Sequence, residues 1–437
     1  MRQFRSGALL ASAFLFAACS GGGGSDEPEP LRGGNNIAPT VTSADIVNVD
    51  ENVAGGFYQA SATDPEGDTP FSWAVSDQGT DSSFFEITGD GELSFIDAPD
   101  FESPRDENAD NEYLVELEVR DALGAIRFFS LRVRVQNIDD GDPVRYVDEV
   151  FTDTFVTRNV QYGEGKRGSS SVPLFMDVFG PSGDAEVLRP TMILVHGGGF
   201  TGGNRQELEE AAESFARRGY TAVTVDYRLL ERAPQTEDEL TIGAIEAFHD
   251  VLAAVRFLQQ DFITQEIYGV DGEKVFVFGV SAGAVVAATM ATFEDDETFP
   301  SQAGRDYLAA NGGYEGETND LGGSVSSEIQ GVISLSGAIL DADWIDADSK
   351  PIYIAHDEFD PIVPCGTSAE GAHNTGLVVV GGCSMIEGYD MRNSTENFRT
   401  LIKIGNVGHV SFNAAEFDRI ISESGQLFLD RVIEPAP

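Results

Sequence analysis

A serine between two glycines is the first place in this chain where residue types and spacing suggest chemistry. The segment Gly279-Val-Ser281-Ala-Gly283 has the form G-x-S-x-G, and it joins an apolar stretch, 274–278, to a helix-competent one, 282–292. A strand, a tight turn and a helix in this order can present a serine hydroxyl at a strained turn, where it can act as a nucleophile. Taken alone, the pattern also fits a glycine-rich turn with a surface serine.

Three consecutive glycines form a second chemical feature. The segment His196-Gly-Gly-Gly-Phe200 follows the apolar stretch 191–195. Glycines in a row lose much backbone entropy and pack nothing, so we interpret them as a place where backbone N–H groups face a ligand. A tetrahedral oxyanion needs such donors. A flexible hairpin is the alternative, but strands of the parallel type end where α/β sheets bind ligands.

The histidines narrow the search for a general base. A serine nucleophile needs a base beside it, and histidine is the side chain that most often serves as one. We predict that His409 is the base, because it lies between an expected strand, 400–404, and the last expected helix, 414–432. Other positions are expected for the remaining histidines: His196 in the glycine loop, His249 inside a helix, His356 at a strand end and His373 in a loop.

Further segments extend the pattern to nearly all of residues 145–437. Together with the serine motif and the glycine loop, Asp226-Tyr-Arg-Leu229 and the segment 250–258 resemble the hormone-sensitive-lipase-like branch of the α/β-hydrolase esterases. The resemblance implies cleavage of carboxylic esters through an acyl-enzyme, without a cofactor in catalysis. It makes Ser281 the nucleophile, with the oxyanion hole formed by the backbone N–H groups of Gly198, Gly199 and Ala282.

The same resemblance points to the acid. These esterases read roughly H-G-x-x-D-x-x-V-P where this chain reads His356-Asp-Glu-Phe-Asp-Pro-Ile-Val-Pro364. Asp360 falls on the fixed aspartate, and its expected role is to orient the imidazole and to stabilise its charged form. Asp357 stands where the family has glycine. Asp357 and Glu358 are the substitutes if Asp360 points outward.

The segments that must position these residues show two alternating sequence patterns. Nearly all-apolar stretches alternate with helical patterns, which predicts an α/β fold with a mainly parallel sheet covered by helices on both faces. The polar, glycine-rich segment 293–327 is expected to be a solvated insertion or, in the interpretation that we prefer, a cap that shapes the acyl pocket. The expected strands are 191–195, 221–227, 274–278, 332–335, 351–355 and 400–404, and the expected helices are 207–218, 242–259, 282–292 and 414–432.

A different pattern, with period two, runs through residues 37–143. Its clearest examples are 113–120 and 129–135, where apolar residues alternate with polar or charged ones. This predicts an N-terminal all-β domain, a half-buried antiparallel sandwich. Because 437 residues exceed what one core usually serves, we expect two domains, with residues 144–437 forming the second.

Acidic residues gather in the links between the expected strands of 37–143. Their order and spacing resemble a single cadherin repeat, which implies structural calcium bound by carboxylate and carbonyl oxygens. Turn-forming acids in an acidic protein are the alternative. At the pole facing the second domain the resemblance gives Glu51, Asp100, Glu102, Asn137, Asp139 and Asp140, and at the opposite pole Asp64, Glu66 and Asp121.

The N-terminus has the features of an export signal. Arg2 and Arg5 precede an apolar run, 7–18, and Cys19 follows Phe-Ala-Ala. Residues 1–19 resemble a bacterial lipoprotein signal in which Cys19 is lipidated, with a Gly/Pro-rich linker at 20–36. We therefore predict a lipoprotein of a bacterial cell envelope, located at the outer membrane or cell surface. We expect its lipid anchor to be the only part that contacts the membrane. Ordinary signal cleavage is the alternative.

Composition adds two expectations. In an exported chain, the remaining cysteines, Cys365 and Cys383, are most simply one disulfide, since no Cys-x-x-Cys or histidine pattern indicates a metal site. With 27 basic and 74 acidic residues, the net charge of −47 disfavours nucleic acid as a partner.

Three functions remain open at this point. The first is a serine hydrolase acting on a small-molecule, carbohydrate or polymer ester. The second is a serine peptidase on the same fold. The third is a cell-surface adhesion protein whose hydrolase domain is inert.

Overall fold

The computed structural model describes residues 36–101, 104–107, 111–136, 138, 143–167, 170–295, 297–319, 321, 325–368, 374–394 and 396–433. The signal, Cys19, most of the linker, Glu102, Asn137, Asp139, Asp140 and His373 lie outside these residues. The chain divides into two compact units, the first ending at Gln136 and the second containing the rest together with residues 100–104. None of the helices described has the length and apolar character of a membrane span.

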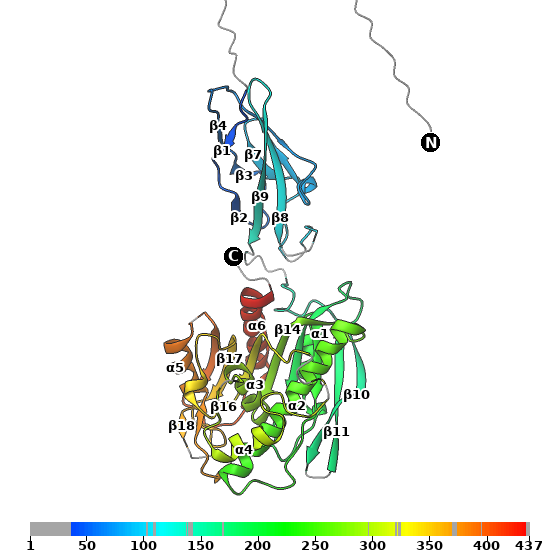
Figure 1. Cartoon of the computed structure of the whole chain (residues 1–437), viewed down its shortest axis with the longest axis vertical. Coiled ribbons are helices and arrows are strands. Elements are labelled where there is room, and N and C mark those ends of the chain that lie inside the picture. Colours follow the sequence, from blue (N-terminus) through cyan, green and yellow to red (C-terminus); the bar gives the residue numbers. More distant parts are fainter. Residues whose placement is uncertain are drawn as a thin grey trace, which may run out of the picture. The chain divides into compact units, whose positions relative to one another are not determined.

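The first unit is built from short strands around an alternating core (Figure 1). Tyr113, Leu117 and Val119 of β8 face inward together with Leu131 and Val133 of β9. Sheet order is β2-β9-β8-β5, β3-β7-β6 and β1-β4. The bounds are β1 Thr40–Val41, β2 Ile46–Asp50, β3 Gly56–Gln59, β4 Ala62–Thr63, β5 Ser72–Val75, β6 Phe85–Ile87, β7 Glu92–Phe95, β8 Glu112–Arg120 and β9 Ile126–Gln136.

One strand pair corrects the prediction of a wholly antiparallel unit. Strand β2 pairs with β9 in parallel, with Ile46 opposite Arg132 and Asp50 opposite Gln136. No hairpin joins these two strands, which are far apart in sequence, so the connection between them does not impose the antiparallel direction.

An eight-stranded sheet forms the centre of the second unit (Figure 1). Its order is β10-β11-β13-β12-β14-β15-β17-β20, and the six strands from β13 to β20 are parallel, as predicted. The bounds are β10 Thr154–Arg167, β11 Ser170–Pro181, β12 Arg189–Val195, β13 Thr221–Val225, β14 Val270–Val280, β15 Gly331–Leu335, β17 Ile352–Asp357 and β20 Phe398–Lys403.

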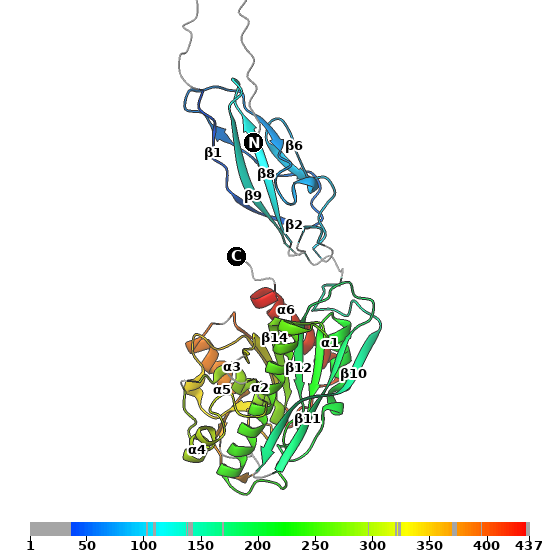
Figure 2. The same cartoon turned by 45° about the vertical axis from the view of Figure 1, so that its right-hand side comes forward.

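The antiparallel pair β10 and β11, at one side of the unit in Figure 2, was not predicted. Much of β10 is exposed to solvent, with Phe155 and Val156 among its exposed residues. An edge strand of this kind carries many polar residues and lacks the continuous apolar run by which a buried parallel strand is identified.

Helices cover both faces of this sheet, because successive residues of each central strand enter different cores. In β12, Ile193 and Val195 pack with α2, α3 and α5, whereas Met192 and Leu194 pack with α1 and α6. A 3₁₀ turn, η2 (Arg205–Leu208), leads into α1, and α4 lies against α2. The helices are α1 Glu209–Arg217, α2 Glu237–Thr264, α3 Ala282–Thr292, α4 Gln302–Ala310, α5 Gly382–Arg392 and α6 Ala414–Phe428, which continues as one π-helical stretch, Leu429–Ile433.

The carboxyl ends of the parallel strands bring the chemically interesting segments to one edge of the sheet. Val195 pairs with Gly279 where β12 and β14 end, and Asp357 pairs with Lys403 where β17 and β20 end. A small sheet of β16 (Ala338–Ile339), β19 (Val379–Gly381) and β18 (Thr367–Ser368) completes the unit. The loops that leave β12, β14, β17 and β20 carry the predicted site.

Candidate active site

Ser281 occupies a strained turn between β14 and α3. Its backbone has φ 55° and ψ −115°, a conformation that non-glycine residues rarely adopt. A Cβ atom at Gly279 would lie 2.2 Å from the carbonyl oxygen of Gly283, and one at Gly283 would lie 2.1 Å from the oxygen of Val195. The two glycines are therefore required for close backbone approach, and the turn holds the serine at the edge of the sheet.

Three side chains from separate loops meet at this edge. The Oγ of Ser281 lies 2.7 Å from Nε2 of His409, and Nδ1 of His409 lies 2.6 Å from Oδ2 of Asp360. The Nδ1–H of His409 donates a hydrogen bond to Asp360, which fixes the tautomer in which Nε2 can accept the proton of the serine hydroxyl. The substitutes Asp357 and Glu358 bond instead to the loop that carries His409, through Asn406, Ser411 and Gly405.

The carboxylate of Asp360 is buried and fully bonded. Its Oδ1 accepts hydrogen bonds from the backbone N–H groups of Ile362 at 2.8 Å and Val363 at 3.0 Å. Burial alone would raise the pKa of Asp360, but hydrogen bonds from His356, His409 and these two amides outweigh it and hold the pKa far below its usual range. Asp360 is therefore ionised at neutral pH, as an orienting acid must be.

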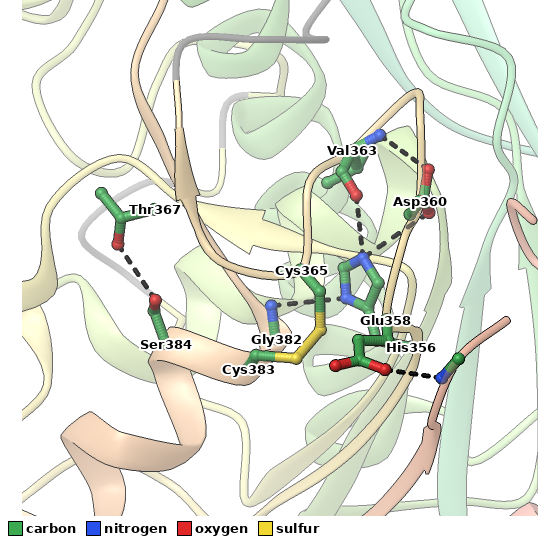
Figure 3. The surroundings of a disulfide bond; sticks show 10 residues. His356, Glu358, Asp360, Val363, Cys365, Thr367, Gly382, Cys383 and Ser384 are labelled. Carbon is green, nitrogen blue, oxygen red and sulfur yellow. Dashed lines mark hydrogen bonds and ion pairs between the residues drawn. A yellow bond between two sulfur atoms is a disulfide. The ribbon is translucent and has the colours of Figure 1, made fainter. Parts of the chain in front are cut away.

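His356 connects this acid to the predicted disulfide, which is present (Figure 3). The Nε2–H of His356 donates to the oxygen of Val363 at 2.9 Å and lies 3.5 Å from Oδ2 of Asp360. Its Nδ1 accepts from the N–H of Gly382 at 3.3 Å, at the start of α5. Cys383, the next residue, is bonded to Cys365 and also donates its N–H to the Cys365 oxygen at 2.7 Å. The disulfide thus joins the acid loop to α5.

Bare amides face the serine from the glycine loop. Gly198 and Gly199 both have positive φ, 108° and 61°. Among the described residues, no acceptor takes a hydrogen bond from the N–H groups of Gly198, Gly199 or Ala282. Such amides can stabilise an oxyanion.

The glycine loop is fixed by His196. Its ring stacks on Tyr227, with the centroids 4.3 Å apart, and its Nδ1–H donates to the oxygen of Gly197 at 2.7 Å. The Tyr227 hydroxyl donates to the oxygen of His196 at 3.0 Å. Burial lowers the pKa of His196, so the ring is neutral at pH 7. These contacts are those of a loop-fixing residue, the role expected for His196.

A cavity of about 60 Å³ opens beside Ser281. Ser281 supplies the only polar side chain among the residues that line it. No described residue of 293–327 takes part, so the expected cap does not form the wall of this cavity; α4 packs on α2 instead. The lining residues are Gly199, Phe200, Leu240, Ala244, Ser281, Ala282, Val285, Ala338, Leu340, Ile362, Val363, Leu377 and Val379.

Sequence reasoning missed three contributions to the site. These are the contact of His356 with the acid, the bonds from Asp357 to the histidine loop, and the pocket wall formed by Leu377 and Val379. A signal existed only for the first, since His356 precedes Asp360 by four residues in a motif that contains both. His249, by contrast, packs within its helix as expected and donates from Nε2 to the oxygen of Gly313 at 2.9 Å.

In the first unit, two of the acids predicted at the pole away from the second domain, Asp64 and Glu66, form a close cluster with Asp68, which was not among the predicted ligands. Carboxylate oxygens of Asp64, Glu66 and Asp68 lie within 4.8 Å of one another. Asp121 is only 4% exposed, and its Oδ2 and that of Asp64 are buried without a hydrogen-bond partner among the described residues. Orphaned carboxylate oxygens of this kind suit a hard cation. At the other pole, only Glu51 and Asp100 are among the described residues.

Comparisons with known proteins agree with this chemistry over part of the chain. A family model described as BD-FAE matches residues 176–339. The chain is 30% identical over 153 residues to a fumonisin B1 esterase of Sphingopyxis macrogoltabida and 27% identical over 130 residues to a juvenile hormone esterase of Tribolium castaneum. These matches cover 33% and 30% of this chain, and only 28% and 21% of the relatives.

Among solved structures, a propionate-bound esterase from Thermogutta terrifontis aligns over 64% of this chain and 95% of its own, with 19% identity and a TM-score of 0.44. The mixed sheet with helices on both faces fits an α/β-hydrolase fold. The family-model match includes the glycine loop and the serine motif but ends before Asp360 and His409.

Proposed function

We propose that the second unit is a carboxylic ester hydrolase that acts through an acyl-enzyme formed on Ser281. The observation that carries the proposal is the hydrogen-bonded chain from Ser281 through His409 to Asp360, with distances of 2.7 and 2.6 Å. The esterase relatives, although they match only part of the chain, support the same chemistry.

The geometry supports a two-step reaction. His409 accepts the hydroxyl proton while Ser281 Oγ attacks the ester carbonyl, and the oxyanion receives hydrogen bonds from the bare amides of the glycine loop and α3. His409 then gives this proton to the departing alcohol, which leaves an acyl-serine. A water molecule, deprotonated by the same imidazole, attacks the acyl carbon and releases the acid and free Ser281.

The cavity beside the serine supports a preference for short, apolar acyl groups. Its volume of about 60 Å³ leaves room for only a few carbon atoms, and apart from Ser281 its lining offers no polar side chain. The alcohol can belong to a small molecule, a carbohydrate or a polymer.

Hydrolysis of p-nitrophenyl esters of increasing acyl length tests the proposal. We expect turnover that is fastest with short chains, and a loss of at least about 1,000-fold in kcat for Ser281→Ala, because the nucleophile is removed. Ser326→Ala, at an exposed serine outside the site, is the control and should match the unchanged protein. Equal rates for Ser281→Ala and the control would refute the proposal.

The other two functions are separated by the same preparation. A peptidase would cleave peptide p-nitroanilides as well as esters, an ester hydrolase would cleave only the esters, and an inert hydrolase domain in an adhesion protein would cleave neither. The intact chain of hydrogen bonds and the bare amides favour the ester hydrolase over an inert domain.

We also propose that the first unit is a cadherin-like module with structural calcium. The cluster of Asp64, Glu66 and Asp68 and the orphaned oxygen of Asp121 support it. Calcium at these residues would neutralise their charge and crosslink the links between strands. The remaining expected ligands, and export with lipid attachment at Cys19, stay predictions of the sequence.

A further inference from the structure

Asp357 is a buried carboxylate that makes no contact with the Ser281 hydroxyl or the His409 ring. It is 0% exposed and ends strand β17, at the position where the esterases that the chain resembles have glycine. Its Oδ1 accepts from Nδ2 of Asn406 at 2.5 Å and from Oγ of Ser411 at 2.5 Å, and its Oδ2 accepts from the N–H of Ser411 at 3.1 Å. All three donors belong to the loop that carries His409, and glycine could accept none of them through a side chain.

That loop has little structure of its own. Residues 404–413 form no helix or strand, and the side chains of Ile404 and Val407 are largely exposed. Besides Asp357, the N–H of Gly405 donates to Glu358 at 2.5 Å, the N–H of Val410 donates to Oγ of Ser336 at 3.2 Å, and the oxygen of Asn406 accepts from the N–H of Phe359 at 2.9 Å. Nζ of Lys403 also donates to the oxygen of Ser411 at 2.7 Å. The hydrogen bonds to Asp357 hold the loop at Asn406 and Ser411, on either side of His409.

The charge of Asp357 strengthens these bonds. Burial alone would raise its pKa, but the hydrogen bonds from Ser411 and Asn406 and the nearby Lys403 lower it below the usual range. The group is therefore an ionised acceptor at neutral pH, and hydrogen bonds to ionised groups are stronger than neutral ones.

We propose that Asp357 is a positioning residue for the general base, which keeps the imidazole of His409 within reach of both Ser281 and Asp360. This inference rests on the proposed ester hydrolysis. Asp357 does not line the cavity beside Ser281, so its loss should reduce the rate of the chemical steps and leave substrate binding intact.

The test compares Asp357 with a second buried aspartate of similar structural duty. Asp261 is 5% exposed and accepts from the N–H groups of Ile267 at 3.1 Å and Tyr268 at 3.0 Å, in a loop after α2 that does not contact the site. We expect Asp357→Ala to lower kcat by about 100-fold with KM unchanged, because small misplacements of catalytic groups have effects of this size. We expect the kcat of Asp357→Asn to lie between that of the unchanged protein and that of Asp357→Ala, since the amide oxygen of asparagine can still accept a hydrogen bond. Asp261→Ala should lower the melting temperature and leave kcat unchanged.

A double-mutant cycle shows whether Asp357 acts through the loop. Asn406→Ala, at a half-buried loop residue, should itself lower kcat, and should add little when combined with Asp357→Ala. Should Asp357→Ala fail to fold, Asn406→Ala and Asp357→Asn decide the matter.

Two outcomes would overturn the inference while the unchanged protein remains active. One is an unaltered kcat in both Asp357→Asn and Asn406→Ala, and the other is a parallel rise of KM with no loss of kcat. An unchanged protein that hydrolyses no ester would instead refute the proposed function, because the reaction that His409 is positioned for would be absent.

Discussion

Three acids within four residues have three different tasks, and their partners decide which. Asp360 accepts from the imidazole of His409, Asp357 from the side chains and backbone of the loop around it, and Glu358 from the amide of Gly405. Residue type alone does not distinguish these carboxylates. Their positions do, since Asp357 ends β17, whereas Glu358 and Asp360 lie in the loop that follows it.

The buried carboxylates make the stability of the second unit depend on acid. In the folded protein the pKa values of Asp357 and Asp360 lie below the usual value of 3.8, so the unfolded chain binds protons first as the pH falls. Their contribution to the free energy of unfolding is complete above about pH 4 and is lost as the pH falls through the folded-state pKa values. Urea midpoints measured from pH 6 to pH 3 should show the difference between the unchanged protein and Asp357→Asn shrinking; a constant difference would contradict this.

At the residue scale, the sequence was sufficient to select three residues that the structure brings together, Ser281, His409 and Asp360, because each lies in a motif with a fixed relation to a strand. It was not sufficient for His356 and Asp357. The bonds of Asp357 depend on the register that places it opposite Lys403 at the end of β20, and no local pattern specifies the pairing of strands that are distant in sequence. His356 contacts Val363 and Asp360 within its own motif, but also Gly382, which is distant in sequence.

At the scale of elements, the disulfide bond links the wall of the cavity beside Ser281 to the surroundings of Asp360. The segment that it closes contains β18 and β19, and Leu377 and Val379 of this segment line the cavity. Its far end places the amide of Gly382 on His356. One covalent bond thus stabilises a pocket wall and the surroundings of Asp360.

We expect reduction of Cys365–Cys383 to lower both stability and activity. Releasing a loop with a sequence separation of 18 should cost about 3 kcal/mol of unfolding free energy. The freed wall should raise KM, in contrast to the kcat effect expected for Asp357. Melting curves and ester kinetics with and without dithiothreitol check this, with Cys365→Ser/Cys383→Ser as the variant that should no longer respond. Unchanged kinetics after a thiol assay has shown full reduction would refute it.

Prediction of the elements succeeded where the pattern was strongly periodic. Helix α3 spans Ala282–Thr292 as predicted, whereas α2 begins at Glu237, five residues before the expected start at 242. The first three of the added residues are acidic, and the true start is set by Thr236, which accepts from the N–H of Glu239. Such a cap has no apolar period, so periodicity alone could not find it.

At the scale of the whole molecule, the acidity of the chain makes the proposed calcium binding testable by calorimetry. We expect calcium to raise the melting temperature of that unit, because the cation would offset repulsion among the clustered acids. Asp121→Asn should abolish the rise, whereas Glu86→Ala, at an exposed acid on β6, should preserve it. Identical calorimetric curves in calcium and in chelator would leave the acids as turn formers and surface charge.

The pocket wall has one further consequence, for the evolution of the enzyme. Leu377 and Val379 lie between the two cysteines, on a segment separate from those that carry Ser281 and His409. The crosslink secures both ends of that segment, so its interior can change sequence without disturbing bond cleavage. Substitutions between Cys365 and Cys383 can therefore change which acyl groups bind. A library of variants confined to residues 374–379 should alter acyl selectivity while kcat stays close to that of the unchanged protein.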